Sequence, residues 1–333
     1  MEIHPKFLGM LCCPKSSADL QLAVDEYNDN GTVKTGMLTG PKDRYPIVES
    51  IPRFVDKEYY SASFGYEWKK WSRVQFESEN IGGKMAGHTK KMFAAITGLA
   101  DKSLNGKHVV EFGCGPGRFL DIVRSMGGTA VGIDLSMAVE SARENFRNDT
   151  DVLIVQGDIL NPPFRKGMFD IGYSIGVLHH TPDPRRGLER LCEVVKKGGL
   201  VACAVYSKGS FYDYPSVFLY RKIYNATKGV FGNRLALGYA YFSAYFLYHG
   251  FNTLRKIPFL GKGIVHVLEK YLFVNLPIPD AQWRVLDIFD AVTPYYASTH
   301  TSSEVKEWFE NGKCHDIMQT PWGPTSLVGT KGE

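Results

Sequence analysis

A glycine-rich segment near the middle of the chain has the residue types of a ligand-binding turn. This segment has the sequence Gly-Cys-Gly-Pro-Gly at 113–117, and the apolar run Val109-Val110 precedes it. Glycines let the backbone approach a ligand closely, and the unpaired N–H groups of the next helix can bind it. The Gly-x-Gly-x-Gly spacing differs from the Gly-x-Gly-x-x-Gly that suits a pyrophosphate. Alone, the segment is equally compatible with a plain tight turn.

Two carboxylates follow this segment at the ends of predicted strands. Asp134 lies twenty-one residues after Gly113, where its side chain can accept hydrogen bonds from both hydroxyls of a ribose. Asp158 closes the next strand, where a carboxylate and a neighbouring amide can bind an adenine edge. Either residue could instead cap a helix or stabilise a turn. Because parallel strands bind ligands at their carboxyl ends, the three features together predict one site.

The elements that would position these residues alternate between strand and helix from 107 to 206. The sequence predicts strands at 108–112, 129–133, 152–156, 169–173 and 200–206, with a turn at Gly198-Gly199. It predicts helices at 118–126, 136–146 and 185–194. This alternation predicts an α/β fold with a doubly wound parallel sheet.

On these segments the sequence resembles the class I S-adenosylmethionine-dependent methyltransferases, which have a Rossmann-like fold. The resemblance is strong over about 64–206 and weak in the tail. It rests on the segments 111–117, 132–136, 157–159, 169–174 and 197–199. The segment 174–184 resembles the subgroup that acts mostly on small molecules, sugars and natural products.

The resemblance implies S-adenosyl-L-methionine as cofactor and a set of residues that hold it. The glycines of the loop would line its methionine part, and Glu111 would order the amino-acid end. Asp134 would hold the ribose, Asp158 and Ile159 would face the adenine, and Leu135 would pack on the adenine face. The complete predicted set is Glu111, Gly113, Cys114, Gly115, Gly117, Asp134, Leu135, Asp158, Ile159 and Ser174.

His179 and His180 are the candidate catalytic residues. They follow the fourth predicted strand, on the rim where a methyl acceptor should lie. Histidine titrates near neutrality, so one of them could remove a proton from an acceptor hydroxyl. Alternatively, at least one bonds the backbone and shapes the loop, and the sequence does not separate the two residues. Related enzymes place acidic metal ligands here; this chain lacks that pair, so we expect no metal.

Residues 1–57 resemble a small module derived from a zinc ribbon. The segments 11–16 and 44–55 carry this resemblance, and Asn28-Asp29-Asn30-Gly31 separately predicts a hairpin. A zinc site needs about four ligands. Here Ser16 replaces one cysteine, and the second knuckle at 38–42 has none. The module is therefore predicted to be degenerate, with a structural or docking role and without zinc.

The remaining regions are assigned from their composition and predicted secondary structure. Residues 58–104 are expected to form a helical cap over the cofactor pocket, 105–206 the S-adenosylmethionine-binding core, and 281–333 the completion of the core sheet. Residues 207–280 form a mostly helical insertion, a candidate substrate lid, with nine Lys or Arg and three Asp or Glu. This excess suits an anionic acceptor or an anionic membrane surface, or is simply a solvated basic face.

Length and composition exclude several classes of protein. With 333 residues, 44% of them apolar and 22% charged, the chain is not broadly disordered. A formal charge of +4 and six cysteines without regular spacing indicate neither a nucleic-acid-binding protein nor a disulfide scaffold. No secretory leader is evident, so a cytoplasmic location is expected. Residues 235–254 lack charged side chains, and their tyrosines favour a buried or interfacial helix over a membrane span.

The function predicted is S-adenosylmethionine-dependent methyl transfer, by in-line displacement, to an oxygen of a small molecule or saccharide. The acceptor could be anionic or lipid-linked, with peripheral membrane contact through 207–280. An RNA or protein methyltransferase guided by the N-terminal module is the alternative, which the missing cysteines and modest charge disfavour. A non-catalytic cofactor-binding scaffold is a further alternative. Nucleic acid is not expected as a partner, and the sequence gives no oligomeric state.

Overall fold

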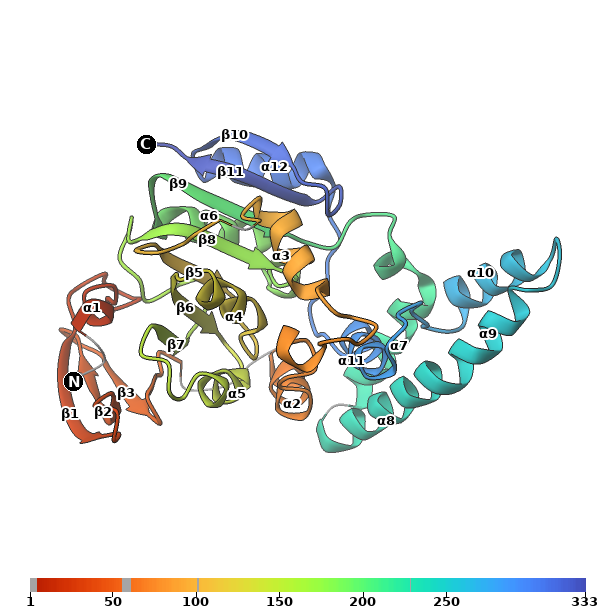
Figure 1. Cartoon of the computed structure of the whole chain (residues 1–333), viewed down its shortest axis with the longest axis horizontal. Helices are drawn as coiled ribbons and strands as arrows, with labels where there is room; N and C mark the ends of the chain where they lie inside the picture. Colours follow the sequence, from red (N-terminus) through yellow and green to blue (C-terminus); the bar gives the residue numbers. More distant parts are fainter. Residues whose placement is uncertain (1–4, 56–60, 101, 228) are drawn as a thin grey trace.

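A seven-stranded sheet forms the centre of the molecule (Figure 1). The computed structural model describes residues 5–55, 61–100, 102–227 and 229–333. The strands are β5 (His108–Phe112), β6 (Thr129–Asp134), β7 (Val152–Gln156), β8 (Phe169–Ile175), β9 (Val195–Ala204), β10 (Cys314–Gln319) and β11 (Ser326–Lys331), in the order β10-β11-β9-β8-β5-β6-β7. Strands β5 to β9 are parallel, and β11 pairs antiparallel with β9. The predicted α/β fold with a mostly parallel sheet is therefore confirmed.

Helices cover both faces of this sheet because successive residues of a buried strand point to opposite sides. Val109 belongs to a buried cluster with α3 (His88–Thr97), α4 (Arg118–Ser125) and α5 (Ala138–Asn145). Val110 belongs to a second cluster with α6 (Pro184–Val194) and α12 (Ser302–Asn311). The near-continuous apolar runs of the central strands are thus explained by burial on both faces.

One prediction of a turn was wrong. Gly198 and Gly199 do not precede the fifth strand but lie inside β9, which begins at Val195. The pairing register with β8 shifts between Phe169 and Ile171, and Gly198 has φ of 76°. Between these pairs β9 advances five residues, from Val195 to Leu200, while β8 advances two, so the glycine pair lies in an irregular segment inside the strand.

The N-terminal segment forms a second, antiparallel sheet against the edge of the central one. It contains α1 (Pro5–Leu8) and the strands β1 (Gln21–Tyr27), β2 (Val33–Thr39), β3 (Arg44–Val48) and β4 (Ile51–Pro52). The predicted hairpin at 28–31 joins β1 to β2. Arg53 forms a parallel bridge with Gln156 of β7, so this small sheet covers an otherwise exposed edge. The predicted boundary at residue 57 lies outside the described residues.

Further helices lie before the central sheet and in the insertion. Helix α2 (Ala62–Lys70) precedes α3, and the insertion contains α7 (Pro215–Thr227), α8 (Gly229–Tyr241), a π-helical segment η4 (Phe242–Leu247), α9 (Tyr248–Leu254) and α10 (Gly261–Tyr271). Short 3₁₀ helices are η1 (Glu77–Glu79), η2 (Leu178–His180) and η3 (Phe211–Asp213). Helix α11 (Ala281–Val292) follows the insertion and packs against α2, α7 and α8.

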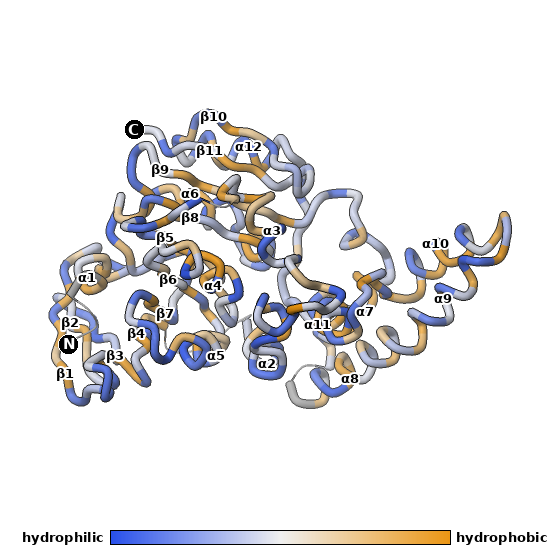
Figure 2. The backbone as a smooth tube through the Cα atoms, viewed as in Figure 1, coloured by the Kyte–Doolittle hydropathy of each residue, from blue (hydrophilic) through white to orange (hydrophobic). Residues whose placement is uncertain are grey.

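The insertion projects from the body as a long helical arm (Figure 1). Apolar residues continue along it as far as its tip (Figure 2). Among the described helices, none combines the length and hydropathy required to cross a membrane. The charge-free run at 235–254 falls in α8, η4 and α9 and is not a candidate span.

Candidate active site

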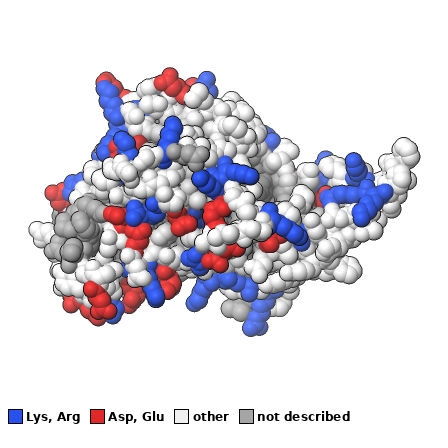
Figure 3. All heavy atoms as spheres, viewed as in Figure 1, with Lys and Arg blue, Asp and Glu red and all other residues white. Residues whose placement is uncertain are grey.

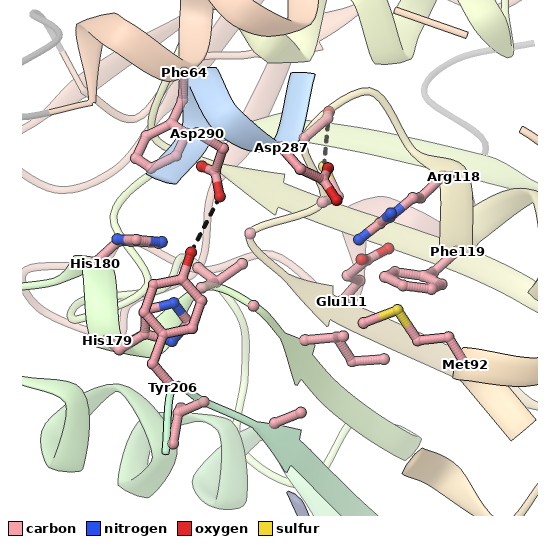
Figure 4. A pocket seen from close by; sticks show the side chains of 18 of the residues that line it. Phe64, Met92, Glu111, Arg118, Phe119, His179, His180, Tyr206, Asp287 and Asp290 are labelled. Atoms are coloured by element: carbon pink, nitrogen blue, oxygen red, sulfur yellow. Dashed lines mark hydrogen bonds between the residues drawn. The ribbon is translucent and has the colours of Figure 1, made fainter. Parts of the chain in front are cut away.

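A cavity of about 460 Å³ opens at the carboxyl ends of the parallel strands. The glycine loop after β5 and the ends of β6 and β8 form its floor, and α2, α11 and the segment 322–326 form its walls. Figure 4 shows side chains from these separate elements pointing toward one another. The sheet therefore brings together residues that are far apart in the sequence.

The glycine loop adopts a backbone conformation that other residues rarely reach. Gly113 has φ of 78°, and a Cβ there would lie 2.3 Å from Cγ1 of Val177. Gly115 has φ of 51°, and a Cβ at that residue would lie 3.3 Å from Nε1 of Trp68 on α2. Both glycines are thus required by their left-handed φ angles and by close neighbours. Trp68 closes the loop side of the cavity.

Asp134 lies at the end of β6 and organises this loop. Its Oδ2 accepts a hydrogen bond from the Gly115 amide at 2.9 Å, and its Oδ1 accepts from the amide and hydroxyl of Ser136 at 2.9 and 2.8 Å. Burial raises the pKa of the carboxyl, and these hydrogen bonds oppose that effect. Both lone pairs of Oδ1 are thus engaged, whereas Oδ2 keeps one lone pair. Asp134 can therefore hold the loop and still accept a hydrogen bond from a ligand through Oδ2.

Asp158 follows β7 on the same rim. Its Oδ1 accepts a hydrogen bond from the Leu160 amide at 2.9 Å, as in the turn that the sequence left as an alternative. Burial raises the pKa of Asp158. Because Asp158 and Ile159 also line the cavity, the turn and a ligand contact are compatible.

Glu111 and Arg118 face each other deep in the cavity (Figure 4). Glu111 is buried and accepts a hydrogen bond from Tyr173 at 3.1 Å. Burial raises its pKa well above the ordinary value. Arg118 begins α4, and its guanidinium donates to Gln75. This pair offers one acidic and one basic group, which suit the two ends of an amino acid.

The structure distinguishes the surroundings of His179 and His180, which the sequence alone did not. The Nδ1 of His180 lies 2.9 Å from the carbonyl oxygen of Tyr296, so it carries the proton and leaves Nε2 as an acceptor. That Nε2 is buried and has no hydrogen-bond partner in the described part of the chain. Both ring nitrogens of His179 are also without a described partner, and its ring stacks 3.7 Å from that of Tyr206. Burial lowers the pKa of both histidines.

Sequence reasoning missed a group of acids on α2 and α11. Glu67, Asp287 and Asp290 line the cavity, and Asp290 accepts a hydrogen bond from Tyr206 at 3.1 Å (Figure 4). Glu67 is fully buried, and neither of its carboxyl oxygens has a partner among the described residues. Burial raises the pKa of Glu67 well above its ordinary value and that of Asp287 to about 7. The available signal was the i, i+3 spacing of Asp287 and Asp290 within an apolar helix.

Most of the predicted site residues lie on this cavity. Those that line it are Glu111, Gly113, Cys114, Gly115, Asp134, Leu135, Asp158, Ile159, His179 and His180. Two predicted residues do not. Gly117 packs against Phe146 at the start of α4, and Ser174 donates to the carbonyl of Phe112 at 2.9 Å beneath the loop. Both residues therefore lie at the glycine loop and not on the cavity lining.

None of the basic residues that the structure describes in the insertion lines the cavity. Arg221 donates to the Ala291 carbonyl at 2.8 Å, and Arg255 is paired with Glu269. In the N-terminal sheet, Sγ of Cys13 lies 3.2 Å from the Tyr45 hydroxyl. No three His, Cys, Asp or Glu side chains of the described ranges are grouped so that they could hold a metal.

Comparison with known families identifies the segment that carries the glycine loop. Residues 110–203 match the family described as "Methyltransferase domain". This match spans β5 to β9, the five parallel strands of the sheet. The N-terminal sheet, α2, the arm and α11 lie outside it.

Curated relatives match over a similar region. A 24-methylenesterol C-methyltransferase 2 of Arabidopsis thaliana is 26% identical over 56% of this chain and 53% of its own length. A demethylmenaquinone methyltransferase of Lactococcus lactis is 33% identical over 53% of this chain and 60% of its own length. The chain thus spans about half the length of the curated relatives it matches.

A solved structure gives a further, weaker match. Human N-acetylserotonin methyltransferase, determined in complex with SAM, aligns with 81% of this chain and 57% of its own, at 12% identity and a TM-score of 0.44.

Proposed function

We propose, from the premise that residues 110–203 form a methyltransferase domain, that this chain methylates a hydroxyl of a small molecule or saccharide. The observation that carries the proposal is the arrangement of the glycine loop and Asp134 on one cavity with His180 and the acids of α11. Methyl donor and acceptor would then meet between the sheet edge and α11.

The residues on the sheet side fit S-adenosyl-L-methionine. Asp134 would accept a hydrogen bond from the ribose through Oδ2, and Asp158 with Ile159 would face the adenine. Glu111 and Arg118 would bind the charged amino-acid end. Gly176 also lines the cavity, and a Cβ there would meet nothing within 4 Å, so it leaves space for a ligand. The bound cofactor supplies an already activated methyl group, so the protein mainly aligns the reactants.

The residues on the α11 side favour a neutral, hydroxyl-bearing acceptor. Glu67 is buried and interacts electrostatically with the partly buried Asp287 and Asp290, and any negative charge on this group would repel an anion. Carboxyl groups with raised pKa values can both donate hydrogen bonds to hydroxyls and accept from them. The rings of Phe64, Tyr206 and Tyr212 also line this part of the cavity and suit the apolar face of a sugar or an aromatic ring. The lipid-linked acceptor remains compatible, whereas the anionic one is disfavoured here.

His180 is the proposed general base. Its Nδ1–H is fixed on Tyr296, so Nε2 presents a lone pair, and its ring is directed toward Asp290 and Tyr206 (Figure 4). The lowered pKa keeps the imidazole neutral near pH 7, as a base requires. An acceptor would have to displace the ring of Tyr206 or Phe64 to reach Nε2. His179, covered by Tyr206, would support the loop instead.

A radiolabelled-methyl screen tests the proposal. Purified chain and labelled S-adenosyl-L-methionine are incubated with extract separated into small-molecule, glycan, lipid, RNA and protein pools. Label is expected in the small-molecule or glycan pool, lipid-linked glycans included. Label confined to RNA or protein would overturn the acceptor class. Cofactor binding without label in any pool would support the scaffold alternative.

The two histidines provide matched variants for the same assay. His180→Gln should lower kcat by about a hundredfold or more, the usual contribution of a general base. Its affinity for the cofactor should not change. His179→Gln should have the smaller effect on kcat. Equal rates for wild type and His180→Gln would remove His180 from the mechanism.

A further inference from the structure

The arm, defined as residues 215–272, exposes an unusual share of the large apolar side chains. Among the described residues, twenty-two such side chains are exposed, and sixteen of them lie between 218 and 272. Only six are spread over the rest of the described chain. A concentration of this kind marks a surface that contacts a protein or a membrane. The arm is therefore the part of the molecule that we expect to contact a partner.

The tip of the arm is its most apolar and most exposed part. It is the turn 257–260 between α9 and α10, where Ile257, Phe259 and Leu260 are 47%, 104% and 65% exposed. Phe259 has φ of 64°, a left-handed conformation that is rare and costly for a bulky residue. Exposed lysines, Lys256 and Lys262, lie on either side of the turn. An apolar tip between two lysines suits insertion at a lipid headgroup boundary.

Aromatic residues continue this surface along the long helical rod of the arm. Phe242 and Phe246 stack at 5.4 Å and are 45% and 71% exposed. Tyr241 and Tyr245 stack at 6.2 Å and are also exposed. Tyrosine and other aromatic side chains are typical of the interface between membrane and water.

The charge of the arm is strongly positive. Between 215 and 272 there are eight Lys or Arg residues and one acid, Glu269. Glu269 is paired with Arg255, so it offers no free negative charge. The Nζ of Lys222 lies 4.5 Å from the ring of exposed Phe218, an arrangement in which a long side chain covers an apolar ring and keeps its charge in water. Figure 3 shows blue Lys and Arg atoms on the arm amid a mostly white surface.

We propose that the arm docks on an anionic membrane surface, with the tip 257–260 inserted at the headgroup boundary. Charge complementarity selects this partner, because clustered Lys and Arg beside apolar residues bind anionic lipid. A second copy of the arm would oppose positive charge to positive charge. A nucleic acid would leave the aliphatic side chains of Ile257 and Leu260 without a suitable contact. No described helix is able to span a membrane, so the contact is peripheral.

The base of the arm is joined to the cavity wall. Helix α7 packs against α11, and the Arg221 Nε–Ala291 carbonyl hydrogen bond of 2.8 Å links the two. Val217 of α7, Ala240 of α8 and Phe289 of α11 share one buried cluster. Docking of the tip would therefore hold the cavity in a fixed position relative to the lipid surface.

Vesicle sedimentation tests the proposal on the full chain. Vesicles of phosphatidylcholine alone are compared with vesicles in which about a third of the lipid is phosphatidylglycerol. The chain should sediment with the anionic vesicles only, and added salt should weaken the binding. Phe259→Glu should lower the bound fraction by about tenfold or more, because it places a negative charge in the apolar tip. Replacing Lys256 and Lys262 together with Gln should weaken binding at low salt.

Met318→Glu is the matched control. Met318 is 63% exposed on β10, away from the arm, and its replacement should leave vesicle binding unchanged. Binding that Phe259→Glu does not weaken would overturn the proposal. An absence of binding to anionic vesicles would also overturn the proposal. If the chain then self-associates in sedimentation velocity and Phe259→Glu abolishes this, the partner of the tip is a second copy of the chain. Cofactor affinity, measured on the same variants, reports separately on the proposed function.

Discussion

Asp287 links the buried acids of the cavity to the stability of the fold. Burial, together with the charge of Asp290, raises its pKa from 3.8 to about 7. Between these values the folded protein binds a proton that the unfolded chain releases. The free energy of unfolding should therefore fall as pH rises from about 4 to about 7, by up to about 1.4 kcal/mol per pH unit.

Replacing this carboxyl should flatten that dependence. Asp287→Asn cannot ionise, so its free energy of unfolding should fall less over the same pH range than that of the wild type. Some dependence should remain, because burial also raises the pKa values of Glu67 and Glu111. Denaturant unfolding across this pH range measures the effect, and Asp25→Asn, at an exposed position, is the control. Identical pH profiles for Asp287→Asn and wild type would contradict the account.

The sequence identified the residues at the sheet edge better than those on the opposite wall. Asp134 and Asp158 end strands whose apolar runs are readable, so their common edge follows from the parallel topology. Glu67 and Asp287 lie on helices whose docking depends on tertiary packing. Their spacing in the sequence gives no indication that they meet. The choice between His179 and His180 likewise required the contact with Tyr296, more than a hundred residues away.

At the scale of the element, the glycine loop is the feature with the least freedom to vary. Gly113→Ala combines a left-handed φ with a close approach of the new Cβ to Val177. Gly98 at the end of α3 has φ of 69° but nothing within 4 Å of its Cβ position, so Gly98→Ala isolates the backbone cost. We expect Gly98→Ala to lower the free energy of unfolding by about 1–2 kcal/mol.

Gly113→Ala should cost about 1–3 kcal/mol more than Gly98→Ala, because the added methyl overpacks a rigid contact. It should also lower cofactor affinity by about tenfold, since the loop lines the cavity. Chemical denaturation and calorimetric titration of both variants measure these two effects. Equal losses of stability with intact affinity would show that the loop tolerates the methyl and does not shape the cavity.

Strands and helices of the core were predictable because their apolar periodicity is strong. Strand β7 was predicted with the bounds it has in the structure, and α4 and α6 to within one residue. The irregular segment inside β9 was not predicted, because a Gly-Gly pair is equally typical of a turn between two elements. Its status depends on whether β8 pairs on both sides of it, which is a long-range property.

At the scale of the whole molecule, three parts surround the core, which contains the segment that matches the methyltransferase family model. The N-terminal sheet covers the β7 edge, α2 and α11 close the cavity, and the arm extends its apolar tip into solvent. The basic and aromatic composition of the insertion was evident in the sequence. That Arg221 is buried between α7 and α11, and that none of the insertion's described cations lines the cavity, became clear only from the tertiary packing.

Calorimetric titration of S-adenosylhomocysteine, the demethylated cofactor, into the purified full chain tests the central claim most directly. The wild type should bind one molecule per chain, and Asp134→Ala should weaken binding by about tenfold or more, through loss of charge-assisted hydrogen bonds. Asp134 also anchors Gly115 and Ser136, so its loss could disturb the fold. Circular dichroism is therefore the control, and it should show that the variant remains folded. No heat of binding to the wild type, or equal affinity of a folded Asp134→Ala, would contradict the assignment of this cavity.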